Sequence, residues 1–476
     1  MEFDRREIKR NRWFYLIEFA IDIAVILFAY WAGFRLHRVE LFWGEVPSEV
    51  WESLFYICLI AAIIFTVFKP YKCGITPYFE TLINLLVAIF FIALVAVFLD
   101  YAIKGVGIYR RTVFYALLVQ TPIFIVIKYI MIKLHAFFVK PNDSIIIADS
   151  LEEAGELALD LIDSQSNMIK IKYLASQNTD NFESYLVKAQ QVFFSPSCTN
   201  EVKTRLIEYC AANNIDCAVV PSFKEIIVNS GQLNNANDTL LLNMNIKHDI
   251  ESRFIKRTMD IVISGVGLIV LLPLLLVTAL LIRIQDGGKA IYSQERLTKR
   301  NKKFSIYKFR TMIENAEEGT GAVLASADDK RITKLGKFLR MTRIDEIPQL
   351  LNVLKGDMSL VGPRPERPDL VSEIIKDTPE FSYRTIVKAG LTGLAQIKGR
   401  YNTDFRNKLL FDLYYVNNFS LLLDLKIMFN TILVIFTPSA SEGYSKTDET
   451  ESCFNRIKKR GYEVEHTDGC VILNKD

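Results

Sequence analysis

The chain has 476 residues, enough for two or three domains, and half of them are hydrophobic, a high share for a soluble protein. A formal net charge of +3 is too small to indicate a nucleic-acid-binding protein, and no nucleic-acid-binding motif is present. Seven cysteines without a C-x-x-C pair and four scattered histidines give no indication of zinc, of disulfides or of Ser/His or Cys/His catalysis.

Four apolar segments predict that residues 1–140 form a membrane domain. They cover about residues 13–34, 51–68, 82–99 and 113–134, each close to the ~20 residues that cross a bilayer. Basic residues before the first segment place the N-terminus in the cytoplasm, and four crossings return the chain there near residue 140. Three acids within the first two segments, Glu18, Asp22 and Glu52, are expected to mark packing positions or helix ends.

Residues 141–232 alternate between strand-like and helical patterns, which predicts a Rossmann-like parallel α/β domain. Its strands are expected at 144–148, 168–174, 191–195 and 216–221. The first turn, Ala148–Gly155, lacks the G-x-G-x-x-G that lets a backbone approach a pyrophosphate, and it carries acids instead. We therefore expect no nucleotide here and leave a structural, dimerising (homodimer) or regulatory role open. Residues 233–250 are expected to be a polar linker.

Asp345 and Glu346 stand where a helix should begin, because Pro348 has no amide proton and fits only a first helical turn. Helix N-termini keep carboxylates ionised and also hold phosphates, so Asp345 could be a nucleophile toward phosphorus. The alternative is a capping box, Thr342-x-x-Asp345, in which the carboxylate only closes backbone hydrogen bonds.

Polar and basic residues surround this acidic pair and favour phosphoryl chemistry. Pro363 and Pro365 stiffen the chain on both sides of one arginine, so its planar fork can meet a phosphate at little ordering cost. The residues in question are Gln294, Arg296, Lys308, Arg310, Arg340 and Arg364.

The sequence segments that contain these residues, together with Gly356–Pro365 and Gly390–Tyr401, resemble the bacterial sugar transferase family. Its members are the membrane-bound polyprenyl-phosphate sugar-1-phosphate transferases, and the resemblance covers about residues 251–436. The resemblance implies that an Asp attacks the β-phosphate of a nucleotide sugar, releases the nucleoside monophosphate and passes the phosphosugar to polyprenyl phosphate. We expect a UDP-hexose as donor, release of UMP, a bacterial inner membrane location with the catalytic domain facing the cytoplasm, and a role in exopolysaccharide, capsule or O-antigen synthesis.

Carried over residue by residue, the resemblance makes Asp345 the nucleophile and Glu346 a Mg²⁺ ligand or acid/base partner. Asp345 is a second candidate Mg²⁺ ligand. The family's phosphate-binding role falls on Lys308, Arg340 and Arg364, with Gln294, Arg296 and Arg310 as further candidates. The chain departs from the family at Thr298 and Asn301, which stand where glycines are usual; Asn301 can adopt the left-handed conformation at modest cost.

The catalytic domain is predicted to cover residues 251–440 and to begin with a re-entrant membrane helix, 259–283, broken at Pro273. An ordinary kinked span is the alternative. A further apolar run at 419–436 carries charges near its start, which favours a helix lying in the membrane interface.

Residues 441–476 are expected to be a tail, in which 462–465 and 471–473 could pair as a hairpin. The fold class is therefore a membrane protein of α and α/β parts. Two other functions stay open: a membrane nucleotide-sugar dehydratase or epimerase, which would need the missing glycine motif, and a non-enzymatic assembly or regulatory protein.

Overall fold

The computed structural model describes residues 3–37, 48–70, 78–104, 110–138, 141–163, 169–179, 182–229, 232–236, 239–243, 250–313, 329, 331–399, 405–435, 452–467 and 470–475. By internal contacts the chain forms two compact units, residues 1–220 together with 451–476, and residues 221–450.

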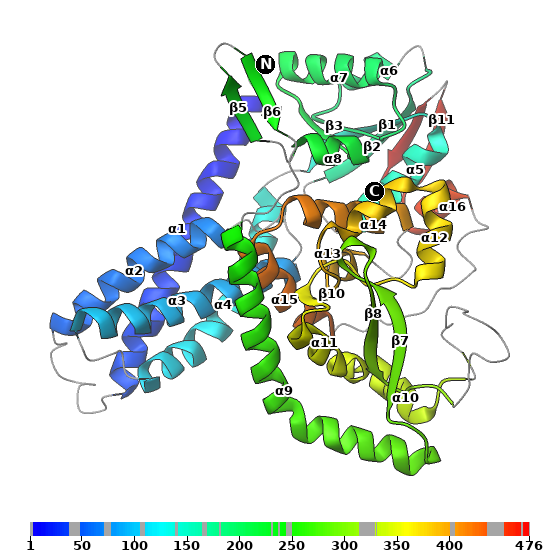
Figure 1. The fold of residues 1–476 in the computed structure, drawn as a ribbon. Helices are drawn as coiled ribbons and strands as arrows, with labels where there is room; N and C mark the ends of the chain where they lie inside the picture. Colours follow the sequence, from blue (N-terminus) through cyan, green and yellow to red (C-terminus); the bar gives the residue numbers. More distant parts are fainter. Residues whose placement is uncertain are drawn as a thin grey trace. The chain divides into compact units, whose positions relative to one another are not determined.

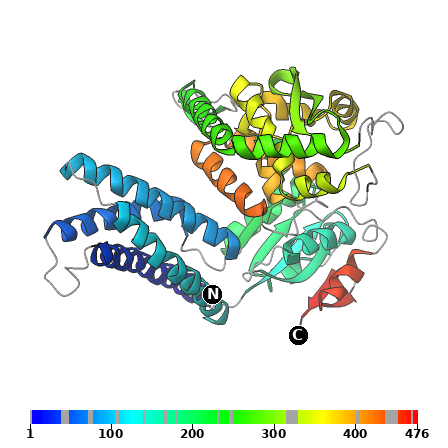
Figure 2. The same cartoon turned by 90° about the horizontal axis from the view of Figure 1, so that it is seen from below.

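Four long helices at the N-terminus pack side by side and coincide with the four predicted apolar segments (Figures 1 and 2). They are α1 (Phe3–His37), α2 (Ser48–Phe68), α3 (Tyr78–Lys104) and α4 (Arg110–Phe138). Within the described residues, five helices are long and apolar enough to cross a membrane: these four and a later helix that includes Ile250–Gln285. The chain is therefore a membrane protein.

A cluster of three charges joins α1 to α4. Lys128 Nζ lies 2.8 Å from Glu18 Oε1 and 2.6 Å from Asp22 Oδ2, and all three side chains are fully buried. The prediction that Glu18 and Asp22 mark a packing interface is confirmed. The sequence alone did not identify Lys128, because the cation lies more than 100 residues away along the chain.

The α/β domain contains the predicted parallel strands. These are β1 (Asn142–Ala148), β2 (Ile169–Ser176), β3 (Gln191–Phe194) and β4 (Asp216–Val219), in the spatial order β2-β1-β3-β4. Helices α5 (Leu151–Asp163), α6 (Phe182–Leu186) and α7 (Asn200–Asn213) connect them. Isoleucines 145, 146 and 147 of β1 are fully buried between the two cores of this sheet, which explains the uninterrupted apolar pattern of the strand.

The C-terminal segment is part of this sheet. Strands β11 (Glu463–Thr467) and β12 (Cys470–Asn474) form the predicted antiparallel hairpin, and β12 also pairs antiparallel with β2. Helix α16 (Cys453–Lys459) packs on α5 at Gly155, where a Cβ would collide with Cys453 Sγ. What the sequence predicted to be a tail therefore extends the sheet to six strands.

The second unit begins with α8 (Phe223–Asn229), followed by an antiparallel pair, β5 (Gln232–Ala236) and β6 (Thr239–Asn243), where a polar linker was expected. The single helix α9 (Ile250–Asp286) comes next and contains Pro273. Figure 1 shows α9 bent partway along its length. Whether the helix re-enters the membrane or crosses it stays a prediction.

The remaining elements pack on three hydrophobic clusters, which contain Val353, Phe381 and Leu339 respectively. A hairpin of β7 (Ile291–Leu297) and β8 (Lys303–Phe309) turns through η2 (Lys299–Asn301). It is followed by α10 (Lys334–Met341), η3 (Ile344–Gln349), α11 (Leu350–Lys355), β9 (Ser359–Val361), α12 (Pro368–Asp377) and η4 (Pro379–Ile386). The unit ends with β10 (Gly390–Thr392), α13 (Leu394–Lys398), α14 (Phe405–Asn417) and α15 (Leu421–Ile435).

Asn301 has a φ of 57°, as expected for the position where glycine is usual, and Arg300 shares this left-handed conformation. In α15, Asp424 is fully buried rather than at a surface: its carboxylate lies 2.6 Å from Lys256 Nζ of α9 and accepts a hydrogen bond from the Tyr415 hydroxyl at 2.7 Å. This carboxylate therefore ties α15 to α9, and the position of α15 in the membrane interface stays a prediction.

Candidate active site

A short helical turn presents the acidic pair. Asp345 and Glu346 lie in the first turn of η3, as predicted, whereas Pro348 lies further along η3, just before α11. Arg343, just before it, adopts a left-handed conformation with φ 59°, which sharply separates η3 from α10. The capping-box interpretation is wrong, because the Thr342 hydroxyl donates to the carbonyls of Phe338 and Leu339 at the end of α10 instead.

Asp345 is a buried carboxylate with an unused acceptor. Its side chain is 8% exposed, and Oδ1 has no hydrogen-bond partner among the described residues. Burial, and then the negative charge of Glu346, raise the pKa of Asp345 to about 6, against the opposing effect of Lys308, Arg340 and Arg343. A desolvated carboxylate of this kind is a better nucleophile than a hydrated one, and most of it is ionised at neutral pH.

Glu346 is held by two cations. Its Oε1 lies 2.7 Å from Lys308 Nζ and 3.1 Å from Arg364 Nη2. Burial opposes ionisation, but the charges of Arg364 and Lys308 outweigh it and hold the pKa of Glu346 below its usual value. Burial likewise lowers the pKa of Lys308, with Glu346 opposing the effect. Strand β8, the Pro363–Pro365 loop and η3 therefore meet at one carboxylate.

Arg340 and Arg310 lie on the α10 side of the site. Arg340 Nε donates to Thr311 Oγ1 at 2.9 Å, and its charge acts on Asp345. Arg310 directly follows β8, and its guanidinium lies against Gly288. Lys308, Arg340 and Arg364, from three separate segments, are thus brought together around the acidic pair, whereas the Arg310 guanidinium lies at Gly288.

Gln294 and Arg296 support the Pro363–Pro365 loop, which carries Arg364 and is called the arginine loop below. Arg296 donates to Gln294 Oε1 at 2.7 Å and to the Pro365 carbonyl at 3.3 Å, and its guanidinium lies 3.7 Å from Glu366. On the other side of the loop, Arg384 donates to the Arg364 carbonyl at 3.1 Å and pairs with the buried Asp412 at 2.7 Å. The backbone around Arg364 is therefore fixed from both sides.

Two buried amides near Asp345 were not singled out from the sequence. Fully buried Asn352 accepts a hydrogen bond from Tyr307 N at 3.0 Å and donates one to the Ser305 carbonyl at 2.8 Å. Its side chain thus makes the hydrogen bonds that a neighbouring strand would otherwise make to this edge of β8. Gln349, four residues after Asp345, is 3% exposed, and its Nε2 has no partner among the described residues. Such buried amides could not be predicted, because a single polar residue produces no periodic pattern in the sequence.

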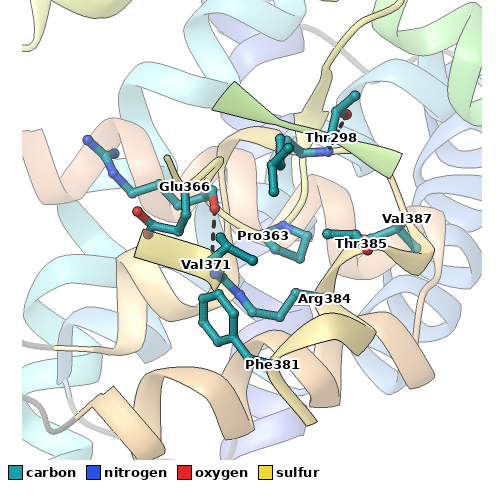
Figure 3. A pocket seen from close by; sticks show the side chains of 11 residues that line it. Thr298, Pro363, Glu366, Val371, Phe381, Arg384, Thr385 and Val387 are labelled. Atoms are coloured by element: carbon teal, nitrogen blue, oxygen red, sulfur yellow. Dashed lines mark hydrogen bonds between the residues drawn. The ribbon is translucent and has the colours of Figure 1, made fainter. Parts of the chain in front are cut away.

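A small pocket of mostly apolar lining lies beneath the arginine loop (Figure 3). Figure 3 labels Pro363, Val371, Phe381 and Val387 among the apolar lining residues, together with Arg384. The Thr298 hydroxyl in its wall is already bonded to the Asp357 carbonyl and to Ala389 N. With its polar groups committed, we assign the pocket no ligand.

The carboxylates suit a magnesium ion. Mg²⁺ is commonly bound by one or two carboxylates together with substrate phosphates, and it needs no larger cage. Asp345 Oδ1 is buried and has no partner, and Glu346 Oε2 makes no hydrogen bond to the described residues, since both cations contact Oε1. Among the described residues there is no group of three or more His, Cys, Asp or Glu that would hold a metal unaided.

A carboxylate occupies the place in the α/β domain where such sheets usually bind a ligand. In such sheets ligands bind where the strand order reverses, here between β1 and β3. Glu153 lies at this point and accepts hydrogen bonds from the hydroxyls of Ser195 and Ser197. The negative charge of Glu153 would repel the phosphate of a nucleotide at this position. That the domain binds no nucleotide stays a prediction, which this repulsion supports.

Comparison with known proteins places the similarity on the second unit. Residues 251–438 match the model of the family described as bacterial sugar transferase. The chain is 46% identical over 187 residues to an Aeromonas hydrophila UDP-N-acetylgalactosamine-undecaprenyl-phosphate N-acetylgalactosaminephosphotransferase, covering 39% of this chain and 44% of that protein. It is 38% identical over 234 residues to the Salmonella typhimurium undecaprenyl-phosphate galactose phosphotransferase, covering 46% of this chain and 48% of that protein.

These two matches span somewhat less than half of each relative's length. A shorter relative is covered almost completely. The exopolysaccharide production protein PSS of Rhizobium leguminosarum bv. phaseoli is 41% identical over 190 residues, which are 38% of this chain and 94% of that protein.

Proposed function

Because the chain belongs to the bacterial sugar transferase family, we propose that it transfers a sugar-1-phosphate from a nucleotide sugar, a UDP-hexose, to undecaprenyl phosphate. The observation that carries the proposal is the buried, partly unpartnered carboxylate of Asp345 beside a glutamate held by Lys308 and Arg364. The undecaprenyl phosphate named for two similar proteins supports the choice of acceptor.

In the first step, an oxygen of the ionised Asp345 carboxylate attacks the β-phosphorus of the nucleotide sugar. The bond between this phosphorus and the bridging oxygen breaks, and UMP leaves with the electron pair. Lys308, Arg340 and Arg364 bind the phosphate oxygens and stabilise the charge that develops on them. The sugar-1-phosphate is then joined to Asp345 as an acyl phosphate.

In the second step, a phosphate oxygen of undecaprenyl phosphate attacks the same phosphorus. The Asp345–phosphorus bond breaks, the carboxylate is regenerated, and an undecaprenyl-diphosphate sugar is formed. Glu346 would hold Mg²⁺ together with Asp345, and the ion would neutralise charge on the diphosphate oxygens when bound. The bent helix α9 and the four N-terminal helices would keep the site at the inner membrane, facing the cytoplasm.

The direct test incubates the purified full-length protein with undecaprenyl phosphate and a panel of UDP-sugars and measures UMP. We expect UMP release with one UDP-hexose. More than one turnover per enzyme should require undecaprenyl phosphate. Absence of UMP with every sugar, in protein that is folded and supplied with Mg²⁺, would contradict the proposal. A dehydratase or epimerase would instead alter the sugar while leaving the nucleotide attached.

A further inference from the structure

Five cations gather at the other end of the β7–β8 hairpin from the candidate active site. We call Arg253, Arg257, Lys299, Arg300 and Lys388 the basic cluster. Lys299 interacts electrostatically with Arg253 and Arg300, and Lys388 with Arg257 and Lys299. Arg257 and Lys388 also flank the same glycine: a Cβ at Gly356 would lie 3.2 Å from Arg257 Nη2 and 3.5 Å from Lys388 Nζ.

The charges of this cluster are poorly compensated. Arg257 donates to the carbonyls of Val353 and Leu354 at the end of α11, at 2.6 and 2.7 Å. The other four have no ion pair with the described residues. Two acids act on Lys388 from nearby: Asp357, and Asp260, whose carboxylate already accepts from Ser359 Oγ and Leu360 N. Five positive charges thus face two negative ones.

Like charges held together while partly buried are unfavourable without a counter-ion. Lys299 and Lys388 are half-buried, and burial followed by the neighbouring cations lowers the pKa of each lysine. An anion placed among these groups would relieve the repulsion. The cluster therefore has the charge of a phosphate-binding site, and it is distinct from the one around Asp345, because β8 separates the turn at Lys303 from Lys308 by about 17 Å at ~3.4 Å per residue.

Two of the five cations stand beside exposed apolar side chains on a helix that could enter a membrane. Arg253 and Arg257 lie in the first two turns of α9, which is long and apolar enough to enter a bilayer. Ile250 and Phe254, in the same turns, are 77% and 72% exposed. Basic side chains beside exposed apolar ones at the start of such a helix suit a lipid headgroup with its acyl chains, rather than a free ion.

We propose that the basic cluster binds the phosphate headgroup of an anionic phospholipid where α9 enters the membrane. The lipid phosphate would lie among Lys299, Lys388 and Arg253, and its acyl chains would extend past Phe254 along the exposed apolar residues that follow in α9, among them Ile261 and Val262. This site does not take part in the chemistry at Asp345, so its occupancy would anchor the catalytic unit without being required for the proposed reaction.

The test uses the full-length protein in a neutral detergent and measures binding of a short-chain phosphatidylglycerol by native mass spectrometry. The variant Lys299→Gln/Lys388→Gln removes two cations, and Lys224→Gln/Lys376→Gln, two exposed lysines of the same unit, makes the matched control. At roughly 1 kcal/mol per basic residue, we expect the first variant to bind about thirty-fold more weakly and the control to bind like the parent. UMP release in neutral detergent should be equal in all three proteins.

Phosphatidylcholine of the same chain length and inorganic phosphate distinguish the sources of the signal. Equal binding of phosphatidylcholine would overturn the requirement for an anion, and equal binding of inorganic phosphate would overturn the lipid assignment. Unchanged phosphatidylglycerol binding by the lysine variant would overturn the site itself. Without lipid, the variant should melt no lower than the parent, because repulsion has been removed; should it fail to fold, Arg253→Gln/Arg300→Gln, at two exposed positions, replaces it with the same expected loss of binding.

Discussion

Lys308 Nζ lies 2.7 Å from Glu346 Oε1 and thereby joins strand β8 to the helical turn that carries Asp345. Both side chains are largely buried, with 21% and 13% of their surface exposed. A second pair on the same hairpin, Lys303 and Glu295, has the same separation of 2.7 Å but is mostly exposed. Burial, rather than distance, should therefore decide which pair matters for activity.

We expect a double-mutant cycle on kcat/KM to show this difference. Lys308→Met and Glu346→Gln should each cost activity, and the double variant should lose less than the sum, with a coupling of about 2 kcal/mol, typical of contacting groups in one network. The cycle with Lys303→Met and Glu295→Gln should show no measurable coupling. Additive losses at Lys308 and Glu346 would show that the pair does not act as a unit.

Asp345→Asn should abolish turnover, with a loss of at least ~10³ in kcat, because the amide cannot form the acyl phosphate. Stopping the reaction of the parent protein with a labelled UDP-sugar in acid, followed by peptide mapping, should locate the label on Asp345. Asp369→Asn, at an exposed carboxylate on α12, is the control and should keep full activity. A phosphosugar adduct on any other residue would disprove the assignment.

The pH dependence of kcat/KM should reflect the raised pKa of Asp345. A carboxylic acid is ionised above its pKa, so activity should be half-maximal at a pH of about 6, level off about one unit higher and fall about tenfold per unit below it. Glu346 cannot produce this limb, because its pKa is held below its usual value. Raising the Mg²⁺ concentration should move the limb to lower pH, since a bound cation favours the carboxylate. A profile that is flat between about pH 5 and 8 would contradict this origin.

Lys128→Met should destabilise the N-terminal helices by about 3–5 kcal/mol, because it leaves Glu18 and Asp22 buried without their cation. Lys133→Met, on the exposed side of the same helix, is the control and should change stability little. The measurement is the thermal unfolding midpoint in detergent. Equal midpoints for the two variants would show that the buried charges are compensated in another way.

The topology of α9 can be tested with reporters fused after residues 240 and 440. A helix that bends at Pro273 and returns to the same side places both reporters in the cytoplasm, whereas a span separates them. Pro273→Leu restores the missing backbone hydrogen bond, so part of this variant should adopt a crossing helix and lose activity in proportion. A wild-type reporter after residue 440 that is labelled from outside the cell would disprove the re-entrant helix.

Local patterns predicted a large part of this structure. Apolar length identified α1 to α4, alternation of strands and helices identified β1 to β4, and Pro348 placed Asp345 in a first helical turn. These features are determined by residues close together in the sequence, so local patterns reveal them. The grouping of Lys308, Arg340 and Arg364 near Asp345 followed from the family resemblance rather than from any periodicity.

The remaining features depend on contacts between distant residues. The partner of Asp424 was not identified from the sequence, because its cation, Lys256, lies far away along the chain. Asn352 occupies the edge of β8, and no pattern marks an amide that substitutes for a strand. The pairing of β12 with β2 was equally hidden, since a short hairpin at the end of a chain gives no indication of which edge it joins.

The position of β12 in the sheet sets an order for folding during synthesis. Strand β2 ends at Ser176 and β12 begins at Cys470, so roughly 290 residues separate two neighbouring strands. At about 5–20 residues per second, a ribosome makes this interval in roughly 15 to 60 seconds. Throughout that time the edge of the α/β sheet at β2 lacks its partner strand, and an exposed strand edge can pair with other chains. Protein interrupted late in translation should therefore aggregate through β2, even though its catalytic residues have all been made.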